Sequence, residues 1–352
     1  MKKHAIIPVF IPHLGCPHSC VFCDQKQITA RNKAPSKDEV ISFVEKWLST
    51  LDDVETVELA FYGGSFTAIP LSMQSSYLEI AKSYKDRGLI SKIHLSTRPD
   101  CINKEILDNL EAYSVDTIEL GVQSFDENVL MISERGHDLA SVYNACDLIK
   151  ERGFELGIQL MIGLPMDSYE SCIRSAEETV KIKPNLARLY PTLVLPGTKL
   201  YSMYENREYI PLDREEAVHR CAAMYRILDD AEIHIMRVGL KSTDVISSER
   251  LGEINSGTYH PAFRQLVEDE IAKERIAHLL DGLDKLDGYD DAKHVIIKTH
   301  PSWSSSISGH NGSNKEFFNE KYPHLSFRQE NDEGIKPGRF EIVVNDKAIL
   351  YN

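Results

Sequence analysis

Short apolar segments of the strand type alternate with amphipathic segments of helical period through most of this chain. The intervals between strand-type segments run from about 25 to 50 residues, which allows one right-handed β-α-β crossover in each. Six such units predict a parallel sheet of the α/β class, curled into a partial (β/α)6 TIM-like barrel. The predicted strands are Ile6–Ile11, Thr56–Phe61, Lys92–Ser96, Thr117–Val122, Glu155–Ile162 and Leu186–Leu193.

Amphipathic helices are predicted between these strands. Arg87-Gly88 and Arg152-Gly153 each place a basic residue and then a glycine where a helix is expected to end. The predicted helices are Asp38–Leu48, Ser72–Arg87, Leu139–Arg152 and Ser168–Lys181.

The pattern changes after residue 205. Residues 214–231 predict a helix, residues 233–238 a further strand, and residues 261–283 a long charged helix. We therefore predict a barrel domain over residues 1–240 and a small C-terminal α+β domain over residues 241–352, a candidate substrate or lid domain. Residues 299–312, rich in serine and glycine, predict a flexible surface loop or a lid over the barrel mouth. The predicted C-terminal strands are His294–Thr299, Leu325–Gln329, Phe340–Val344 and Ala348–Tyr351.

The composition is that of a folded, acidic protein. Its 352 residues are 42% hydrophobic, which is enough to bury a full core. With 40 Lys and Arg against 54 Asp and Glu, the net charge is −14, which argues against broad, nonspecific nucleic-acid binding. We find no signal peptide and no apolar run long enough to span a membrane, so we expect no membrane association and a cytoplasmic location.

Glycines and polar residues gather directly after the predicted strands. Tyr62–Thr67 follows the second strand, Ser96–Asp100 the third and Gln123–Phe125 the fourth. In a parallel barrel the carboxyl ends of the strands meet at one mouth, where functional sites lie. The first strand leads to the same mouth, and a group of cysteines follows it.

Cys16, Cys20 and Cys23 lie within one short loop, whereas the other four cysteines are scattered singly along the chain. Thiolate sulfur suits zinc or an iron–sulfur cluster. A zinc site would need a fourth ligand, for which His13 or His18 is available. A four-iron cluster held by three cysteines would instead leave one iron open to a substrate or cofactor.

The loop Gly15-Cys16-Pro17-His18-Ser19-Cys20-Val21-Phe22-Cys23 resembles the CxxxCxxC signature of the radical S-adenosylmethionine (SAM) superfamily. The resemblance covers residues 5–240 and is strongest to the branch of the elongator catalytic subunit and oxygen-independent coproporphyrinogen III oxidase. It implies a 4Fe–4S cluster on the three cysteines and SAM on the open iron. One electron from the reduced cluster then cleaves SAM, and the resulting 5′-deoxyadenosyl radical abstracts a hydrogen atom from a substrate.

The same resemblance assigns SAM-binding residues. Gly63-Gly64-Ser65 is similar to an element that brings backbone groups close to the SAM amino group, an approach that a side chain would block. Gln123 matches a glutamine whose amide faces SAM, and Arg135 matches an arginine that contacts SAM.

Four further positions carry SAM contacts by the same resemblance. Ser96 and Gln159 stand where the oxidase branch has a glutamate and an aspartate, and each can still hydrogen-bond a hydroxyl. Leu193 and Val194 lie where the family contacts adenine, with core packing as the alternative. We assign no catalytic residue beyond the cluster ligands.

The resemblance predicts a radical SAM enzyme with a small-molecule substrate, served by a reductase or by a flavodoxin- or ferredoxin-type electron donor. No second cysteine cluster, N-terminal cobalamin domain or acetyltransferase domain is expected, which disfavours sulfur insertion and acetyl transfer to tRNA. One alternative is a radical SAM enzyme that modifies tRNA, and another is a zinc-stabilised binding protein without catalysis.

Overall fold

The structure, a computed structural model, describes residues 4–11, 16, 18–24, 33–240, 253–255, 257–282, 293–344 and 347–351. The chain divides into two compact units. Unit 1 comprises residues 1–217 and 227–259, and unit 2 comprises residues 218–226 and 260–352. The domain boundary predicted at residue 241 lies outside the described residues. In the described part, every helix is too short or too polar to cross a membrane.

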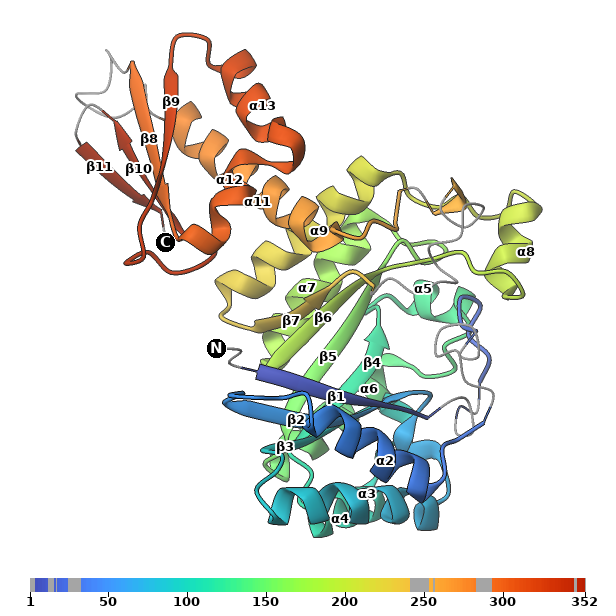
Figure 1. The fold of residues 1–352 in the computed structure, drawn as a ribbon. Helices are drawn as coiled ribbons and strands as arrows, with labels where there is room; N and C mark the ends of the chain where they lie inside the picture. Colours follow the sequence, from blue (N-terminus) through green and yellow to red (C-terminus); the bar gives the residue numbers. More distant parts are fainter. Residues whose placement is uncertain are drawn as a thin grey trace. The chain divides into compact units, whose positions relative to one another are not determined.

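Unit 1 is built on a sheet of seven parallel strands that lie side by side in chain order, curled into a half-barrel (Figure 1). The predicted partial barrel is confirmed, and the further strand predicted at residues 233–238 is also present, as the seventh strand of the same sheet at residues 234–238. The strands are β1 (His4–Ile11), β2 (Thr56–Gly63), β3 (Lys92–Thr97), β4 (Thr117–Gln123), β5 (Glu155–Ile162), β6 (Leu186–Pro191) and β7 (His234–Val238).

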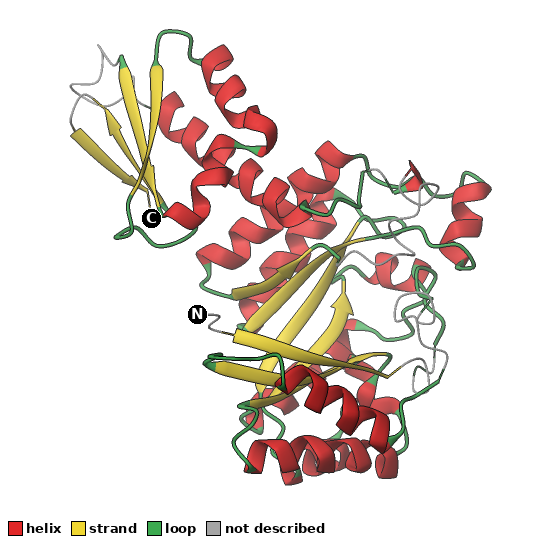
Figure 2. Ribbon diagram, viewed as in Figure 1, coloured by secondary structure: helices red, strands yellow, loops and turns green. Residues whose placement is uncertain are grey.

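Helices connect the strands on the outer face of the curled sheet (Figure 2). The predicted helices are confirmed to within one or two residues at either end, whereas α4 and α5 are short helices that the pattern did not predict. The helices are α2 (Lys37–Leu48), α3 (Leu71–Asp86), α4 (Lys104–Ala112), α5 (Glu127–Ile132), α6 (Leu139–Glu151), α7 (Tyr169–Ile182), α8 (Lys199–Glu205) and α9 (Arg214–Asp230).

Local sequence explains where these helices begin. Ser36 and Glu39 form a capping box at the start of α2, and Asp138 accepts a hydrogen bond from a backbone N–H in the first turn of α6. The unpredicted helices follow the same rule, because Asn103 caps α4 and Asp126 caps α5. These caps satisfy backbone donors that would otherwise have no partner.

The concave face of the sheet carries a buried network of charges. Glu119 on β4 forms an ion pair with Nε of Arg188 on β6 at 2.7 Å, and His94 on β3 lies 3.5 Å from the same carboxylate. His94 also lies 3.3 Å from Glu58 on β2. Nη2 of Arg188 donates to the hydroxyl of Tyr62 on β2 at 2.5 Å. Since β3, β4 and β5 separate β2 from β6 in the sheet, this contact crosses the inside of the curl.

Unit 2 has a four-stranded sheet in the order β11-β10-β8-β9. Each of the four predicted C-terminal strands is present, although the Asn345-Asp346 connection between the last two lies outside the described residues. The elements of unit 2 besides its part of α9 are α11 (Phe263–Asp281), β8 (His294–Thr299), α12 (Ser304–Ser308), α13 (Ser313–Lys321), β9 (Ser326–Asn331), β10 (Phe340–Val344) and β11 (Lys347–Tyr351).

The prediction of a flexible surface loop at residues 299–312 is wrong. This segment begins with the end of β8 and continues through short helices, α12 among them. Trp303 and Ile307 are buried in the core of unit 2, and the Trp303 ring stacks on Phe340 with 6.5 Å between centroids. The apolar residues within a serine-rich stretch therefore direct its folding.

The charges on the concave face should govern the pH dependence of stability. Burial alone would raise the pKa of Glu119, but Arg188 and His94 outweigh it and hold that pKa below its ordinary value. Burial would lower the pKa of His94, but Glu119 and Glu58 outweigh it and raise that pKa. The contribution of Glu119 to the free energy of unfolding is therefore lost as pH falls through its lowered pKa. The contribution of His94 is lost as pH rises through its raised pKa.

We predict that Glu119→Gln lowers the free energy of unfolding at neutral pH by about 3–5 kcal/mol, because it leaves Arg188 buried without its charged partner. Urea titration followed by circular dichroism measures this, and the variant should also lose part of the wild-type stability change between neutral and acidic pH. Asp86→Asn is the matched control, since its exposed pair with Lys82 is worth at most about 1 kcal/mol. Equal losses in the two variants would contradict the prediction.

Candidate functional site

The cysteine loop is anchored at the mouth of the half-barrel by Val21, whose side chain is buried against Val194 and Leu200. The backbone of Val21 makes two hydrogen bonds, one from its N–H to the carbonyl of Ser133 at 3.1 Å and one from the N–H of Leu200 to its carbonyl at 2.7 Å. The loop is thus fixed between the segment after α5 and the start of α8. The predicted ligand Cys20 is buried beside Val21, and His13 lies outside the described residues.

Two arginine side chains face the sulfur of Cys20. Nη1 of Arg135 donates to Cys20 Sγ at 3.0 Å, and Nη1 of Arg98 lies 3.9 Å from the same atom. Nη2 of Arg135 donates to the carbonyl of Gly121 at the end of β4, and its guanidinium lies 6.0 Å from the ring centroid of Phe22. A metal-bound thiolate carries negative charge, and cationic N–H groups are the strong donors for such an acceptor.

Asp100 balances part of this positive charge. Its carboxylate accepts from Nε and Nη2 of Arg98 at 2.9 and 3.2 Å, and ring nitrogens of His18 and His137 each lie 3.9 Å from it. His137 is buried, and burial together with Arg135 and Arg98 lowers its pKa to about 3, so its ring is neutral. The surroundings of Cys20 thus hold two arginine cations and one carboxylate.

Gly63 ends β2 against the last residue of β1. Its φ is +118°, and a Cβ placed there would lie 2.4 Å from the carbonyl oxygen of Ile11. The N–H of Gly64 donates to that same carbonyl at 3.0 Å. Only glycine fits this approach, and it fixes the end of β1 from which the cysteine loop departs.

Gln123, the last residue of β4, lies beside Gln159, which is in the interior of β5. Nε2 of Gln159 donates to Oε1 of Gln123 at 3.4 Å. Gln123 has a φ of +75° and pairs with Leu160 just after a register shift between Gly121 and Gln123, so the extra residue in the β4–β5 ladder is Val122. Ser96 on β3 pairs in register with Glu119 on β4 and is partly exposed.

The remaining predicted site residues are buried. Ser65 directly precedes the short 3-10 helix Phe66–Ala68 and is 3% exposed. Leu193 packs with Leu195, and Val194 packs with Val21. The backbone N–H and carbonyl of Val194 both bond the side chain of Asn255, at 2.7 and 3.0 Å, so that segment is held by the protein itself.

Sequence reasoning missed two sets of residues. One is the charged network on the concave face, which carries a signal, because β2, β3, β4 and β6 each hold a charged or titratable residue within an otherwise apolar run. The other is Arg98, whose contact with Cys20 depends on two loops that are far apart in the chain. The residues of the charged network are Glu58, His94, Glu119 and Arg188.

The four scattered cysteines are distinct from the cysteine loop. All seven cysteines of the chain are free of disulfides. Burial raises the pKa of Cys101 to about 11 and that of Cys146 to about 12, so neither offers a thiolate at neutral pH.

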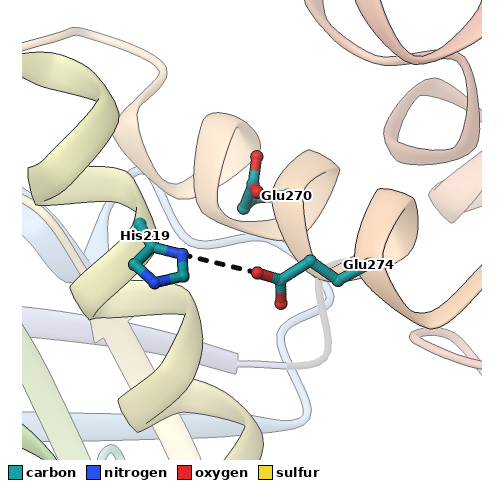
Figure 3. Close-up of side chains that lie close together, drawn as sticks. All are labelled: His219, Glu270 and Glu274. Atoms are coloured by element: carbon teal, nitrogen blue, oxygen red, sulfur yellow. Dashed lines mark ion pairs between the residues drawn. The ribbon is translucent and has the colours of Figure 1, made fainter. Parts of the chain in front are cut away.

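A second group of residues with metal-binding side chains lies in unit 2. His219, Glu270 and Glu274 place their donor atoms within 4.8 Å of one another, with His219 on α9 and both glutamates on α11 (Figure 3). Arg226 pairs with Glu274 at 2.8 Å and Lys273 with Glu270 at 2.6 Å. These cations already balance both carboxylates, so the group is an ion-pair cluster between two helices.

Comparisons with known proteins point in one direction. Residues 10–178 match the Radical SAM superfamily, and residues 184–273 match the Radical_SAM C-terminal domain. The chain is 31% identical over 225 residues to an uncharacterized protein of Methanocaldococcus jannaschii, covering 60% of this chain and 68% of that protein.

Two proteins that are named for a function or a complex are also similar to this chain. A tRNA uridine(34) acetyltransferase of Methanocaldococcus jannaschii is 26% identical over 255 residues, or 61% of this chain and 47% of that protein. Human Elongator complex protein 3 is 29% identical over 218 residues, or 53% of this chain and 40% of that protein. The chain therefore spans less than half the length of these two relatives.

A solved structure shares the fold. The archaeal Elp3 of Methanocaldococcus infernus, with an N-terminal deletion, superposes with a TM-score of 0.58 at 20% identity, covering 72% of this chain and 62% of that one. At this identity the likeness concerns the fold of the chain.

We predict that Gly63→Ala lowers the iron bound per chain after anaerobic reconstitution, because the added Cβ displaces the end of β1 that leads into the cysteine loop. Iron and sulfide assays measure this. Gly88→Ala is the control, since Gly88 has a φ of +68° but no atom within 4 Å of an added Cβ. Backbone strain alone costs about 1–2 kcal/mol and should spare the iron content of Gly88→Ala. The prediction is wrong if both variants bind iron as the wild type does.

Proposed function

Because this chain belongs to the radical SAM superfamily, we propose that Cys16, Cys20 and Cys23 hold the 4Fe–4S cluster that its enzymes use with SAM. When bound, the cluster and SAM supply a 5′-deoxyadenosyl radical that abstracts a hydrogen atom from the substrate. The chain is a radical SAM enzyme, and its ligand residues and its substrate are the parts that we propose.

The observation that carries this proposal is the environment of Cys20. Its sulfur is buried and faces the guanidinium of Arg135 at 3.0 Å, with that of Arg98 at 3.9 Å. Hydrogen bonds to cluster sulfurs and low solvent exposure are general means by which proteins stabilise iron–sulfur centres. The backbone of Val21, the residue after Cys20, is hydrogen-bonded to Ser133 and Leu200, which helps to hold Cys20 in place.

The fit to SAM rests on the adjacent strand ends. Gly63 and Gly64 expose backbone at a point where a side chain at Gly63 would collide with Ile11. Gln123 and Gln159, which lie next to each other on β4 and β5, have amide groups that suit hydroxyl or carboxylate oxygens. Arg135 keeps a cation at the same mouth. We propose that these residues orient SAM, with Ser65, Ser96, Leu193 and Val194 lining its surroundings.

We further propose that the substrate is a tRNA. The support comes from relatives that are named tRNA uridine(34) acetyltransferase. The alignment with one of them covers 61% of this chain. A small-molecule substrate is the second candidate, and the net charge of −14 favours it, because an acidic surface repels RNA. We also propose that a low-potential electron donor of the flavodoxin or ferredoxin type reduces the cluster. The proposed location of the protein is the cytoplasm.

The ligand assignment is tested with Cys20→Ala. Reconstituted wild type, given dithionite and SAM, should release 5′-deoxyadenosine, and Cys20→Ala should release none, because the cluster loses one of its three protein ligands. Liquid chromatography quantifies the product. Cys146→Ala removes a buried cysteine on α6 and should retain wild-type release. Undiminished release by Cys20→Ala would refute the assignment.

The substrate is tested by adding unmodified tRNA transcripts to the same assay. We expect 5′-deoxyadenosine to form several-fold faster with tRNA, and the tRNA complex to weaken as salt rises, since phosphate contacts release counterions. Gel-shift titration at two salt concentrations measures the second effect. If tRNA has no effect while a small-molecule extract accelerates the reaction, the second candidate replaces the first.

A further inference from the structure

Arg98 is a buried cation near Cys20 whose effect on the cluster the proposed function does not specify. It follows the last residue of β3 and is 4% exposed. Its Nε and Nη2 donate to Asp100 at 2.9 and 3.2 Å, and Nη2 also donates to the backbone carbonyl of Arg135. Its Nη1 lies 3.9 Å from Cys20 Sγ. Arg98 thus connects a carboxylate, the segment that carries Arg135 and a proposed cluster ligand.

The charges around Cys20 do not cancel. Arg98 and Arg135 contribute two positive charges, Asp100 contributes one negative charge, and His137 is neutral. Because Arg98, Arg135 and Cys20 are each less than a tenth exposed, solvent screens this excess weakly. A cluster on Cys20 would therefore lie in a positive local field.

We propose that the positive charge of Arg98 raises the reduction potential of the cluster ligated by Cys20, and that the negative charge of Asp100 limits this effect. The inference rests on the proposed cluster ligands. Reduction adds one electron to the oxidised cluster, with no proton or bond change at Arg98 or Asp100. A neighbouring cation with N–H groups directed at the sulfur stabilises the more negative, reduced state. The anion of Asp100 acts in the opposite sense.

The pairing gives the inference a signature of opposite signs. Removing Arg98 should make the reduction potential more negative, whereas removing the charge of Asp100 should make it more positive. A purely structural role would disturb the site in both variants without this reversal of sign. Arg98→Lys keeps the positive charge but loses the pair of hydrogen bonds to Asp100. The reduction potential of its cluster should therefore lie between those of the wild type and Arg98→Met.

The experiment is a redox titration of anaerobically reconstituted protein without SAM or RNA. Dithionite donates the electron, mediators set the potential, and electron paramagnetic resonance measures the reduced cluster. For Arg98→Met we expect about a tenfold lower ratio of reduced to oxidised cluster at fixed potential, a shift of about 59 mV for one electron. Asp100→Asn should shift the ratio the other way. Iron and sulfide per chain confirm equal loading.

Arg152→Met and Asp108→Asn are the matched controls, because they make the same charge changes in a partly exposed pair, 2.7 Å apart, on the helices of unit 1. Shifts in the same direction for the two site variants, or shifts no larger than those of the controls, would overturn the inference. If Arg98→Met binds no cluster, Arg98→Lys and Asp100→Asn test the inference instead. The reduction potential should become more negative in Arg98→Lys and more positive in Asp100→Asn.

The proposed function can fail separately. If tRNA does not stimulate the enzyme but the potentials shift as expected, the substrate proposal fails and the inference stands. If the wild type takes up no 4Fe–4S cluster, the ligand proposal and the inference fail together.

Discussion

The parallel order of the sheet is the constraint on which the rest of unit 1 depends. Because all seven strands are parallel, their carboxyl ends all lie at the same edge of the sheet. Residues as distant in the chain as Cys20, Gly63 and Gln123 therefore gather there without any long connection. The close fit of Gly63 against Ile11 then fixes the first two strand ends relative to each other.

The sequence alone predicts the periodic part of this fold well. Strands and longer helices carry clear periodicity, and caps such as Ser36 mark helix starts. The short helices α5 and α8, of six and seven residues, contain too few turns to show a helical period, whereas α4 buries Leu107 and Leu110 on one face, a signal that the prediction missed. The segment after β8 was misread because its serines and glycines outnumber Trp303 and Ile307, the residues that bury it.

The candidate site divides in the same way. A local motif identifies the three cysteines, and Gly63, Gly64 and Gln123 each follow a predicted strand, whereas Gln159 lies within one. The contact of Arg98 with Cys20 and the bonds of Asn255 to Val194 join segments that are far apart in the sequence, so no local pattern encodes them. Charged residues within apolar strands are an intermediate case, since the pattern reveals their burial but not their partners.

Two buried charge clusters in unit 1 show how placement changes the consequence of a charge. On the concave face, Arg188 and His94 face Glu119 and Glu58, and His4 also lies 3.0 Å from Glu58, so each carboxylate has basic partners and the network chiefly affects stability. Around Cys20 the cations exceed the carboxylate by one. An unbalanced buried charge is costly in a protein that only has to fold, because desolvation is not repaid. It becomes favourable when an anionic group occupies the site, and the negative charge of a thiolate-ligated cluster is of that kind.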